Sequence, residues 1–165
     1  MKKLIMLSLL ILSGVGYAQK NSLSLDKSFS LNQKGALELA EQANIEAEKL
    51  DKKVSIAVLN NSGVVVLLLK GDGVGPHNTE ASRRKAYTAL STKTPSFILM
   101  KKAESSETAK NLNTLPELLL LGGGAPIWSN GELVGSIGIS GGGSGENDHA
   151  IAQRAIQKMG YSLKK

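Results

Sequence analysis

The sequence contains no cysteine and few aromatic side chains, which make up 4% of its residues. The missing cysteine excludes disulfides, thiolate metal sites and lipid attachment at a lipobox. Proteins that bind single-stranded nucleic acids concentrate positive charge and place aromatic rings among the basic residues. This composition therefore predicts no nucleic-acid partner. A domain without disulfides depends on its apolar core, and a chain of this length can supply one.

The positive charge is moderate and dispersed. The formal net charge is +6, and removal of Lys2 and Lys3 with a leader would lower it to +4. Only Arg83-Arg84-Lys85 forms a compact basic cluster. We interpret the excess charge as a solvated surface.

The first 18 residues have the pattern of a signal peptide. Lys2 and Lys3 precede an apolar run from Leu4 to Leu12, and the small residues Gly16 and Ala18 suit a signal-peptidase site. The run is too short for a stable membrane span, and no later run is longer. We therefore expect cleavage after Ala18 and a periplasmic or secreted protein.

The remaining chain predicts a flexible leader at 19–29 and one domain at 30–165. Ser30 and Gln33 have the spacing of a capping box, and alanines between residues 36 and 47 recur at helical spacing. Val54–Leu59 and Val64–Leu69 predict a hairpin. The second of these strands is apolar on both faces, which indicates a central place in the sheet.

Helices are expected from about Thr79 to Leu90 and from Phe97 to about Lys110, followed by a short strand at Leu118–Leu121. The segment 127–140 contains an Asn-Gly turn between apolar runs, a strong hairpin signal. A last helix, capped by Asn147 or Asp148, completes the chain. This order predicts an α+β fold with a single antiparallel sheet flanked by helices.

Two glycine-rich patterns are typical of catalysis or phosphate binding. Gly138-Ile139-Ser140-Gly141-Gly142 matches the G-x-S-x-G elbow of α/β-hydrolases, but the chain has only two histidines and is small for that fold. The glycine runs could hold a phosphate at a helix N-terminus, yet no Walker lysine follows and acidic residues lie nearby. Both functions are disfavoured.

Several side chains could bind a metal ion or a haem. Glu38–Glu41 and Glu104–Glu107 are E-x-x-E pairs, and a helix would place each pair on one face, although two carboxylates make an incomplete site. We retain Glu104 and Glu107 as the metal candidates. The possible iron donors are His77, His149, Tyr87 and Met100, and Arg83, Arg84 and Lys85 could pair with propionates.

The segment Glu80–Ala89 resembles the K-A-x-T-A helix of the GlcG/HbpS family, which includes the C-terminal domain of PduO. Gly122–Ile127 and Gly131–Gly141 are similar to the family's G-G-x-P-I and G-x-x-V-G-x-I-G-V-S-G signature. The resemblance implies a profilin-like sheet and homo-oligomers whose interfaces can hold haem. It also implies a possible sensor-protein partner and haem degradation.

From this resemblance we expect haem, or another flat small molecule, to bind at a region formed by two segments. One is the helix that begins near Thr79, with His77 just upstream and Arg83, Arg84, Lys85 and Tyr87 along it. The other is the Gly122, Gly123 and Gly124 loop. Two alternatives stay open: an enzyme acting on a small metabolite through Lys85, Glu146 and Asp148, and a non-catalytic accessory protein of a glycolate- or diol-type utilisation system.

Overall fold

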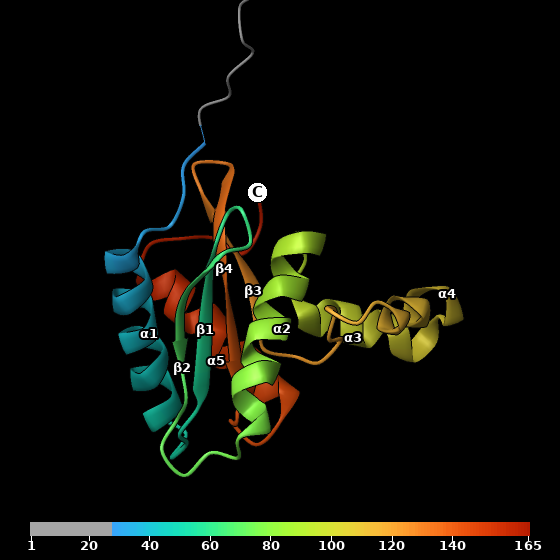
Figure 1. Ribbon diagram of the computed structural model, residues 1–165, viewed down its shortest axis with the longest axis horizontal. Coiled ribbons are helices and arrows are strands. Elements are labelled where there is room, and N and C mark those ends of the chain that lie inside the picture. Colours follow the sequence, from blue (N-terminus) through green and yellow to red (C-terminus); the bar gives the residue numbers. More distant parts are fainter. Residues whose placement is uncertain (1–27) are drawn as a thin grey trace, which may run out of the picture.

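A four-stranded antiparallel sheet with the strand order β2-β1-β4-β3 forms the centre of the computed structural model, which describes residues 28–165 (Figure 1). The strands are β1 (Ser55–Asn60), β2 (Val65–Leu69), β3 (Gly124–Ser129) and β4 (Glu132–Ser140). The expected α+β fold with one antiparallel sheet is confirmed. The predicted signal peptide and nearly all of the predicted leader lie outside the described residues.

Helices cover both faces of this sheet. Helices α1 (Gln33–Glu48) and α5 (Gly145–Lys158) pack together on one face, and α2 (His77–Thr92) lies across the other (Figure 1). Helix α3 (Ser96–Ser105), the short α4 (Glu107–Lys110) and a 3-10 turn at Asn111–Thr114 form an arm that projects from the side of the sheet. Within residues 28–165, no helix is both long and apolar enough to cross a membrane.

Both predicted hairpins are confirmed. The Asn60 side chain accepts hydrogen bonds from the N–H groups of Ser62 (3.0 Å) and Val64 (2.9 Å), which closes the turn between β1 and β2. At the other hairpin, Asn130 and Gly131 have φ values of 50° and 79°. Positive φ at both positions is what the tight turn between two antiparallel strands requires.

The predicted central position of the second strand is wrong. Strand β2 is at the edge of the sheet, and β1 is central because it pairs with both β2 and β4. Val65, Leu68 and Leu69 of β2 remain 37–41% exposed. Apolar residues on both faces of a strand do not determine which other strands pair with it.

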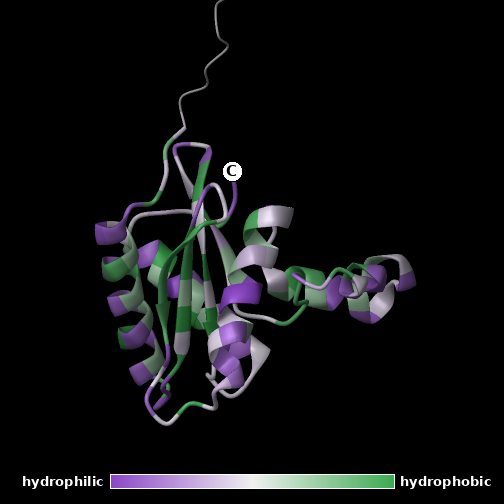
Figure 2. Cartoon of the chain, in the orientation of Figure 1, coloured by the Kyte–Doolittle hydropathy of each residue, from purple (hydrophilic) through white to green (hydrophobic). Residues whose placement is uncertain are grey.

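The main core lies between the sheet and the α1–α5 pair. The alanines of α1 are almost fully buried, as their helical spacing predicted, and they pack with Ile56, Ile139 and Ile151. Figure 2 shows apolar strands along the centre of the molecule and hydrophilic residues along α1 on the side away from the sheet. Small side chains let both helices approach the sheet closely.

The predicted helix from Phe97 to Lys110 is interrupted. Ser106 adopts an extended conformation (φ −143°, ψ 115°) between α3 and α4, and its hydroxyl accepts a hydrogen bond from the Ala109 N–H (3.3 Å). The expected strand at Leu118–Leu121 is a loop. Its backbone hydrogen bonds go partly to side chains, since the Leu119 N–H donates to the Thr88 hydroxyl (2.8 Å).

The capping residues of two helices also differ from those expected. Asn32, and not Ser30, caps α1 through a bond from the Gly35 N–H (3.0 Å). Ser144 caps α5 by accepting from the Asn147 N–H (3.1 Å). This cap leaves the Asp148 carboxylate free for other partners.

Candidate functional site

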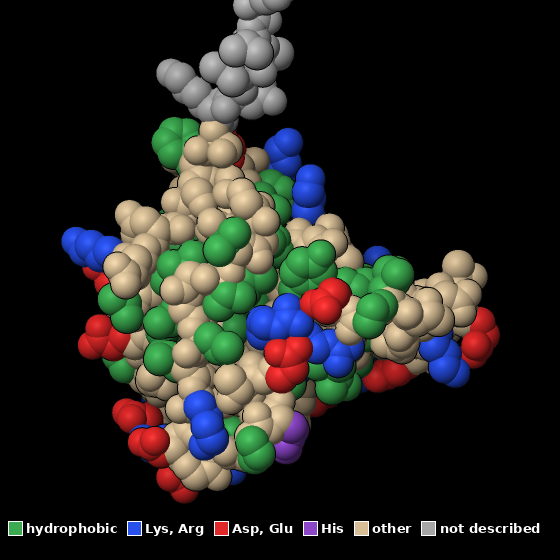
Figure 3. All heavy atoms as spheres, in the orientation of Figure 1, with side chains coloured by type: hydrophobic (Ala, Val, Ile, Leu, Met, Phe, Trp, Pro, Cys, Tyr) green, Lys and Arg blue, Asp and Glu red, His purple; other side chains and the backbone are tan. Residues whose placement is uncertain are grey.

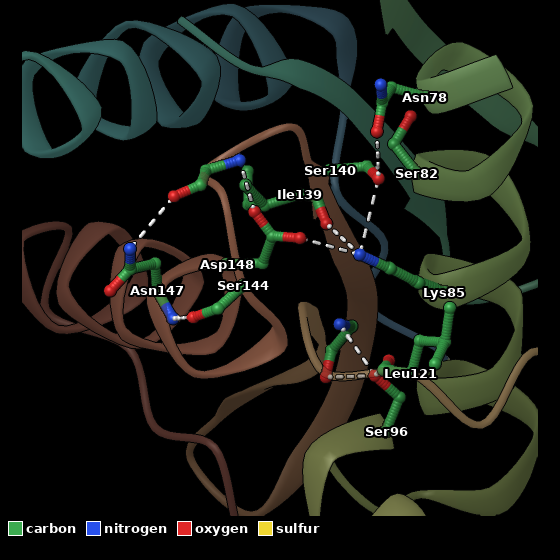
Figure 4. Close-up of polar contacts among 12 residues, drawn as sticks. Asn78, Ser82, Lys85, Ser96, Leu121, Ile139, Ser140, Ser144, Asn147 and Asp148 are labelled. Carbon is green, nitrogen blue, oxygen red and sulfur yellow. Dashed lines mark hydrogen bonds and ion pairs between the residues drawn. The ribbon is translucent and has the colours of Figure 1, made fainter. Parts of the chain in front are cut away.

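The side chain of Lys85 is the most deeply buried cation of the described chain. It points from α2 toward the end of β4 and is 4% exposed (Figure 4). Its ammonium donates to the Asp148 carboxylate (2.7 Å), the Ile139 carbonyl (3.1 Å) and the Ser140 hydroxyl (3.3 Å). Three acceptors match the three N–H bonds of a lysine ammonium, so its charge is fully satisfied.

Asp148 comes to Lys85 from the first turn of α5. Its second carboxylate oxygen accepts from the Gly142 N–H (2.7 Å), so the glycine-rich turn before α5 wraps around the carboxylate. Burial raises the pKa of Asp148, while the Lys85 ammonium and this backbone bond act in the opposite direction. The ion pair therefore joins α2, β4 and α5 at the cost of desolvating two charges.

Ser140 and Asn78 extend this network to a surface pocket of about 400 Å³. The Ser140 hydroxyl donates to the Asn78 side-chain carbonyl (2.8 Å) and accepts from Lys85 (Figure 4). A serine nucleophile needs a base that takes its proton, whereas the Ser140 hydroxyl donates its hydrogen bond to an amide oxygen, which is not a base. This geometry does not favour a serine hydrolase, and neither does the sequence.

The three glycines at 122–124, the last of which begins β3, lie against the chain itself. A Cβ at Gly122 would overlap the Gly145 carbonyl, one at Gly123 the Ile139 carbonyl, and one at Gly124 the Lys85 carbonyl. We expected these glycines to let a planar ligand approach the backbone. The structure places the backbones of α2, β4 and α5 in that space, and all three glycines are buried.

The outer side of α2 carries the other predicted site residues. His77, Glu80, Arg84 and Tyr87 follow one another at intervals of three or four residues and share the side of α2 that faces away from the sheet, with Arg83 beside them. Figure 3 shows basic and acidic side chains gathered over the middle of α2. Thr79 is half-buried, and its carbonyl accepts from the Ser82 hydroxyl (2.8 Å).

The two arginines of this side differ in their partners. Arg83 donates to Glu80 (2.7 and 2.9 Å) and to Glu117 (2.8 Å), which raises the pKa of its guanidinium and lowers the pKa of Glu80. Arg84 donates through Nη2 to the Leu118 carbonyl (2.6 Å), while its Nε is buried without a partner. The three basic residues 83–85 therefore do not face one pocket, since Lys85 points to the opposite side of α2.

The predicted iron donors have different surroundings. His77 is exposed at the start of α2, and Tyr87 is half-buried against Leu90 and Leu99. Met100 lines the pocket beside Lys85. Sequence reasoning missed Asn78 and Ser96. The Ser96 hydroxyl accepts from the Gly124 N–H (2.8 Å) and donates to the Leu121 carbonyl (2.6 Å), but no sequence signal marks either residue.

The structure does not place Glu104 and Glu107 on one helix. Ser106 interrupts the helix between them, and each carboxylate pairs with a lysine of its own helix, Lys101 (3.3 Å) and Lys110 (3.5 Å). Among the described residues, no group of three or more His, Asp or Glu side chains could hold a metal ion. The premise that these two carboxylates share a helix face is therefore wrong.

Comparison with known proteins relates this architecture to one family. Residues 31–157 match the family model described as "Haem degrading protein HbpS-like". Protein GlcG from Escherichia coli K12 is 30% identical over 110 residues, which are 67% of this chain and 81% of GlcG. The corrinoid adenosyltransferase PduO from Citrobacter freundii is 28% identical over 84% of this chain, which spans only 42% of PduO.

Solved structures show the same fold. A double mutant of HbpS from Streptomyces reticuli superimposes with a TM-score of 0.75 and 34% identity, covering 82% of this chain and 90% of that one. The complex of PduOC with haem has a TM-score of 0.74 and 25% identity, covering 82% of this chain and 99% of that one.

Proposed function

This chain belongs to the HbpS-like family, and on that premise we propose that it is a haem-binding protein whose ligand lies against the outer side of α2. The haem complex of the structurally similar PduOC supports this function. The observation that carries the proposed location is that one helix side presents an imidazole, a phenol and two guanidinium groups.

These side chains fit the chemistry of haem. Neutral imidazole and phenolate are both axial ligands of haem iron in proteins, so His77 and Tyr87 are the candidate donors. His77 and Arg84 are seven residues apart, about 10 Å along a helix axis. That spacing allows one side chain to reach the iron and the other a propionate at the edge of the macrocycle.

Arg84 is the better partner for a propionate. Its Nε has no acceptor among residues 28–165, while the Arg83 guanidinium already contacts two carboxylates through Nε and Nη2. Lys85 is excluded because its ammonium points to the other side of α2 and has three acceptors. When bound, haem would supply the iron chemistry on which haem degradation depends, and the residues of α2 would hold and orient it.

A hemin titration followed by absorbance tests the proposal. We expect a saturable Soret band in the wild-type protein and a shifted Soret maximum in either His77→Ala or Tyr87→Phe, depending on which residue is the donor. Glu38→Gln, on the exposed side of α1, is the matched control and should titrate as the wild type does. Folded His77→Ala and Tyr87→Phe proteins that both keep the wild-type spectrum and affinity would place haem elsewhere.

Three further parts of this proposal concern the protein in its cell. We propose that it is exported, that it forms a homo-oligomer, and that it assists a sensor protein. Intact mass of material exported by the native host should correspond to a chain that begins at Gln19. Light scattering should give a multiple of the monomer mass, and a membrane receptor should co-purify with the protein.

A second candidate function, turnover of a small metabolite, is favoured by one observation: the buried Lys85–Asp148 pair lines a pocket of about 400 Å³. Glu146, the third predicted acid/base group, does not join this pair. Its carboxylate is exposed and lies 3.9 Å from Nζ of Lys101. Turnover of glycolate or a diol that disappears in a Lys85→Met protein whose circular dichroism shows that it is folded would support this function. Turnover that persists in that variant would reject it.

A further inference from the structure

A second pocket, of about 430 Å³, lies between α3, α5 and the C-terminal segment, and α2 contributes none of its lining residues. Its apolar walls come from Pro95, Ile98, Tyr161 and Leu163, and its polar groups include His149 and Gln153. Pockets with mostly apolar walls and a few convergent polar groups are the common form of small-molecule sites. This pocket is therefore not part of the haem site proposed on α2.

His149 gives the pocket a flat wall. Its imidazole stacks on the Phe97 ring, with the ring centroids 4.9 Å apart and the planes 10° from parallel. Phe97 is in α3 and His149 is in α5, so the stack fixes the imidazole between two elements. A side chain held in this way presents its ring in one orientation.

The state of the imidazole determines which ligands it can bind. Burial lowers the pKa of His149, so the ring is neutral at pH 7. Its Nδ1 is buried without a hydrogen-bond partner, so Nε2 is the nitrogen that can meet a ligand. Because a buried N–H without an acceptor is rare in proteins, we assign the ring proton to Nε2, which is then the donor that His149 can offer to the pocket it lines.

The C-terminal wall of the pocket is anchored to the sheet. Ser162 exchanges two backbone hydrogen bonds with Trp128 of β3, at 2.8 and 3.0 Å. This bridge holds Tyr161 and Leu163 beside α5. The pocket is therefore preformed.

We propose that this pocket binds a planar, uncharged ligand of one or two fused rings, with a hydrogen-bond acceptor that faces Nε2 of His149. The parallel stack favours a flat ligand, and the apolar walls favour an uncharged one. Of residues 28–165, no carboxylate lines the pocket, and the only charged lining residue, Lys164, is exposed. The acceptor requirement follows from the Nε2–H donor.

Two probes of similar shape test this assignment by fluorescence titration or NMR. Coumarin carries a ring carbonyl, and naphthalene has no acceptor. We expect coumarin to bind more tightly and to shift the His149 ring resonances. The variant His149→Phe keeps the stack but removes the donor, so coumarin affinity should fall about fivefold, the effect of one hydrogen bond, while naphthalene affinity is unchanged.

A second variant tests the location. Ile98 is 40% exposed, so Ile98→Trp should be tolerated by the fold while its side chain fills the pocket and weakens both probes. Wild-type coumarin affinity in either variant, or no coumarin binding at all, overturns the proposal. Hemin should leave coumarin binding unchanged. Competition between hemin and coumarin would mean that haem itself occupies this pocket, which would overturn the proposal of a separate site.

Discussion

Nζ of Lys85 lies 2.7 Å from a carboxylate oxygen of Asp148, although 63 positions separate the two residues in the sequence. Their side chains are only 4% and 6% exposed. Because each charge is the main partner of the other in a poorly solvated space, neither residue can be replaced alone without stranding a buried charge.

The first prediction concerns this pair. Lys85→Met and Asp148→Asn should each lower the free energy of unfolding by about 3–5 kcal/mol. The double variant should lose less than the sum of the two, with a coupling of about 2 kcal/mol, since no unpaired charge remains. Urea unfolding of all four proteins measures this cycle. Additive losses would mean that the two charges do not depend on each other.

The second prediction concerns the contact between α2 and β4. A Cβ at Gly138 would overlap the Ser82 carbonyl of α2. Gly138→Ala should therefore destabilise the fold by about 3 kcal/mol or more, because a backbone cannot give way as a flexible side chain does. Gly160→Ala is the matched control: its φ is +78° and it has open space around it, so it should lose only about 1–2 kcal/mol. Equal losses would argue against this close approach.

A third prediction concerns pH. Burial lowers the pKa of His149 below its ordinary value of 6.5, so below that pH the unfolded chain takes up a proton that the folded chain resists. The unfolded state then binds more protons, and the free energy of unfolding falls as the pH falls. Relative to His149→Phe, the wild type should become steadily less stable between about pH 6.5 and pH 5. Taking the difference between the two proteins cancels the contribution of Asp148.

The control for this experiment is Gly160→Ala. This substitution changes no titratable group, so its pH dependence should match that of the wild type. A wild-type slope in His149→Phe would mean that the imidazole does not titrate differently in the folded and unfolded states.

Local signals in the sequence were sufficient for the hairpins and for the core face of α1. The Asn-Gly turn and the alanine spacing each depend on residues close together in the chain, so the pattern contains the physical cause. The edge position of β2 was not predictable in this way. It depends on β4 pairing with β1, a contact between segments about 80 residues apart, judging from the Ile56–Ile139 pairing.

The candidate site also depends on contacts between residues that are far apart in the sequence. The sequence placed Lys85 and Asp148 together only in the alternative enzyme hypothesis, and no pattern linked either residue to Ser140. The glycines of 122–124 illustrate the reverse case, because a residue without a side chain admits either a ligand or a neighbouring backbone. Only the packed chain shows that the carbonyl groups of α2, β4 and α5 occupy that space.

The last prediction separates the two arginines on the outer side of α2. Arg83 is held by Glu80 and Glu117, whereas Nε of Arg84 has no acceptor. If Arg84 binds a propionate, Arg84→Gln should weaken hemin about tenfold or more, because a charge-assisted hydrogen bond is lost. Arg83→Gln should have a smaller effect. Iron etioporphyrin, which lacks propionates, should bind all three proteins equally, and its titration is the control. A loss of etioporphyrin affinity equal to that of hemin in Arg84→Gln would show that Arg84 supports the helix and not the propionate, since both ligands would then lose the same surface.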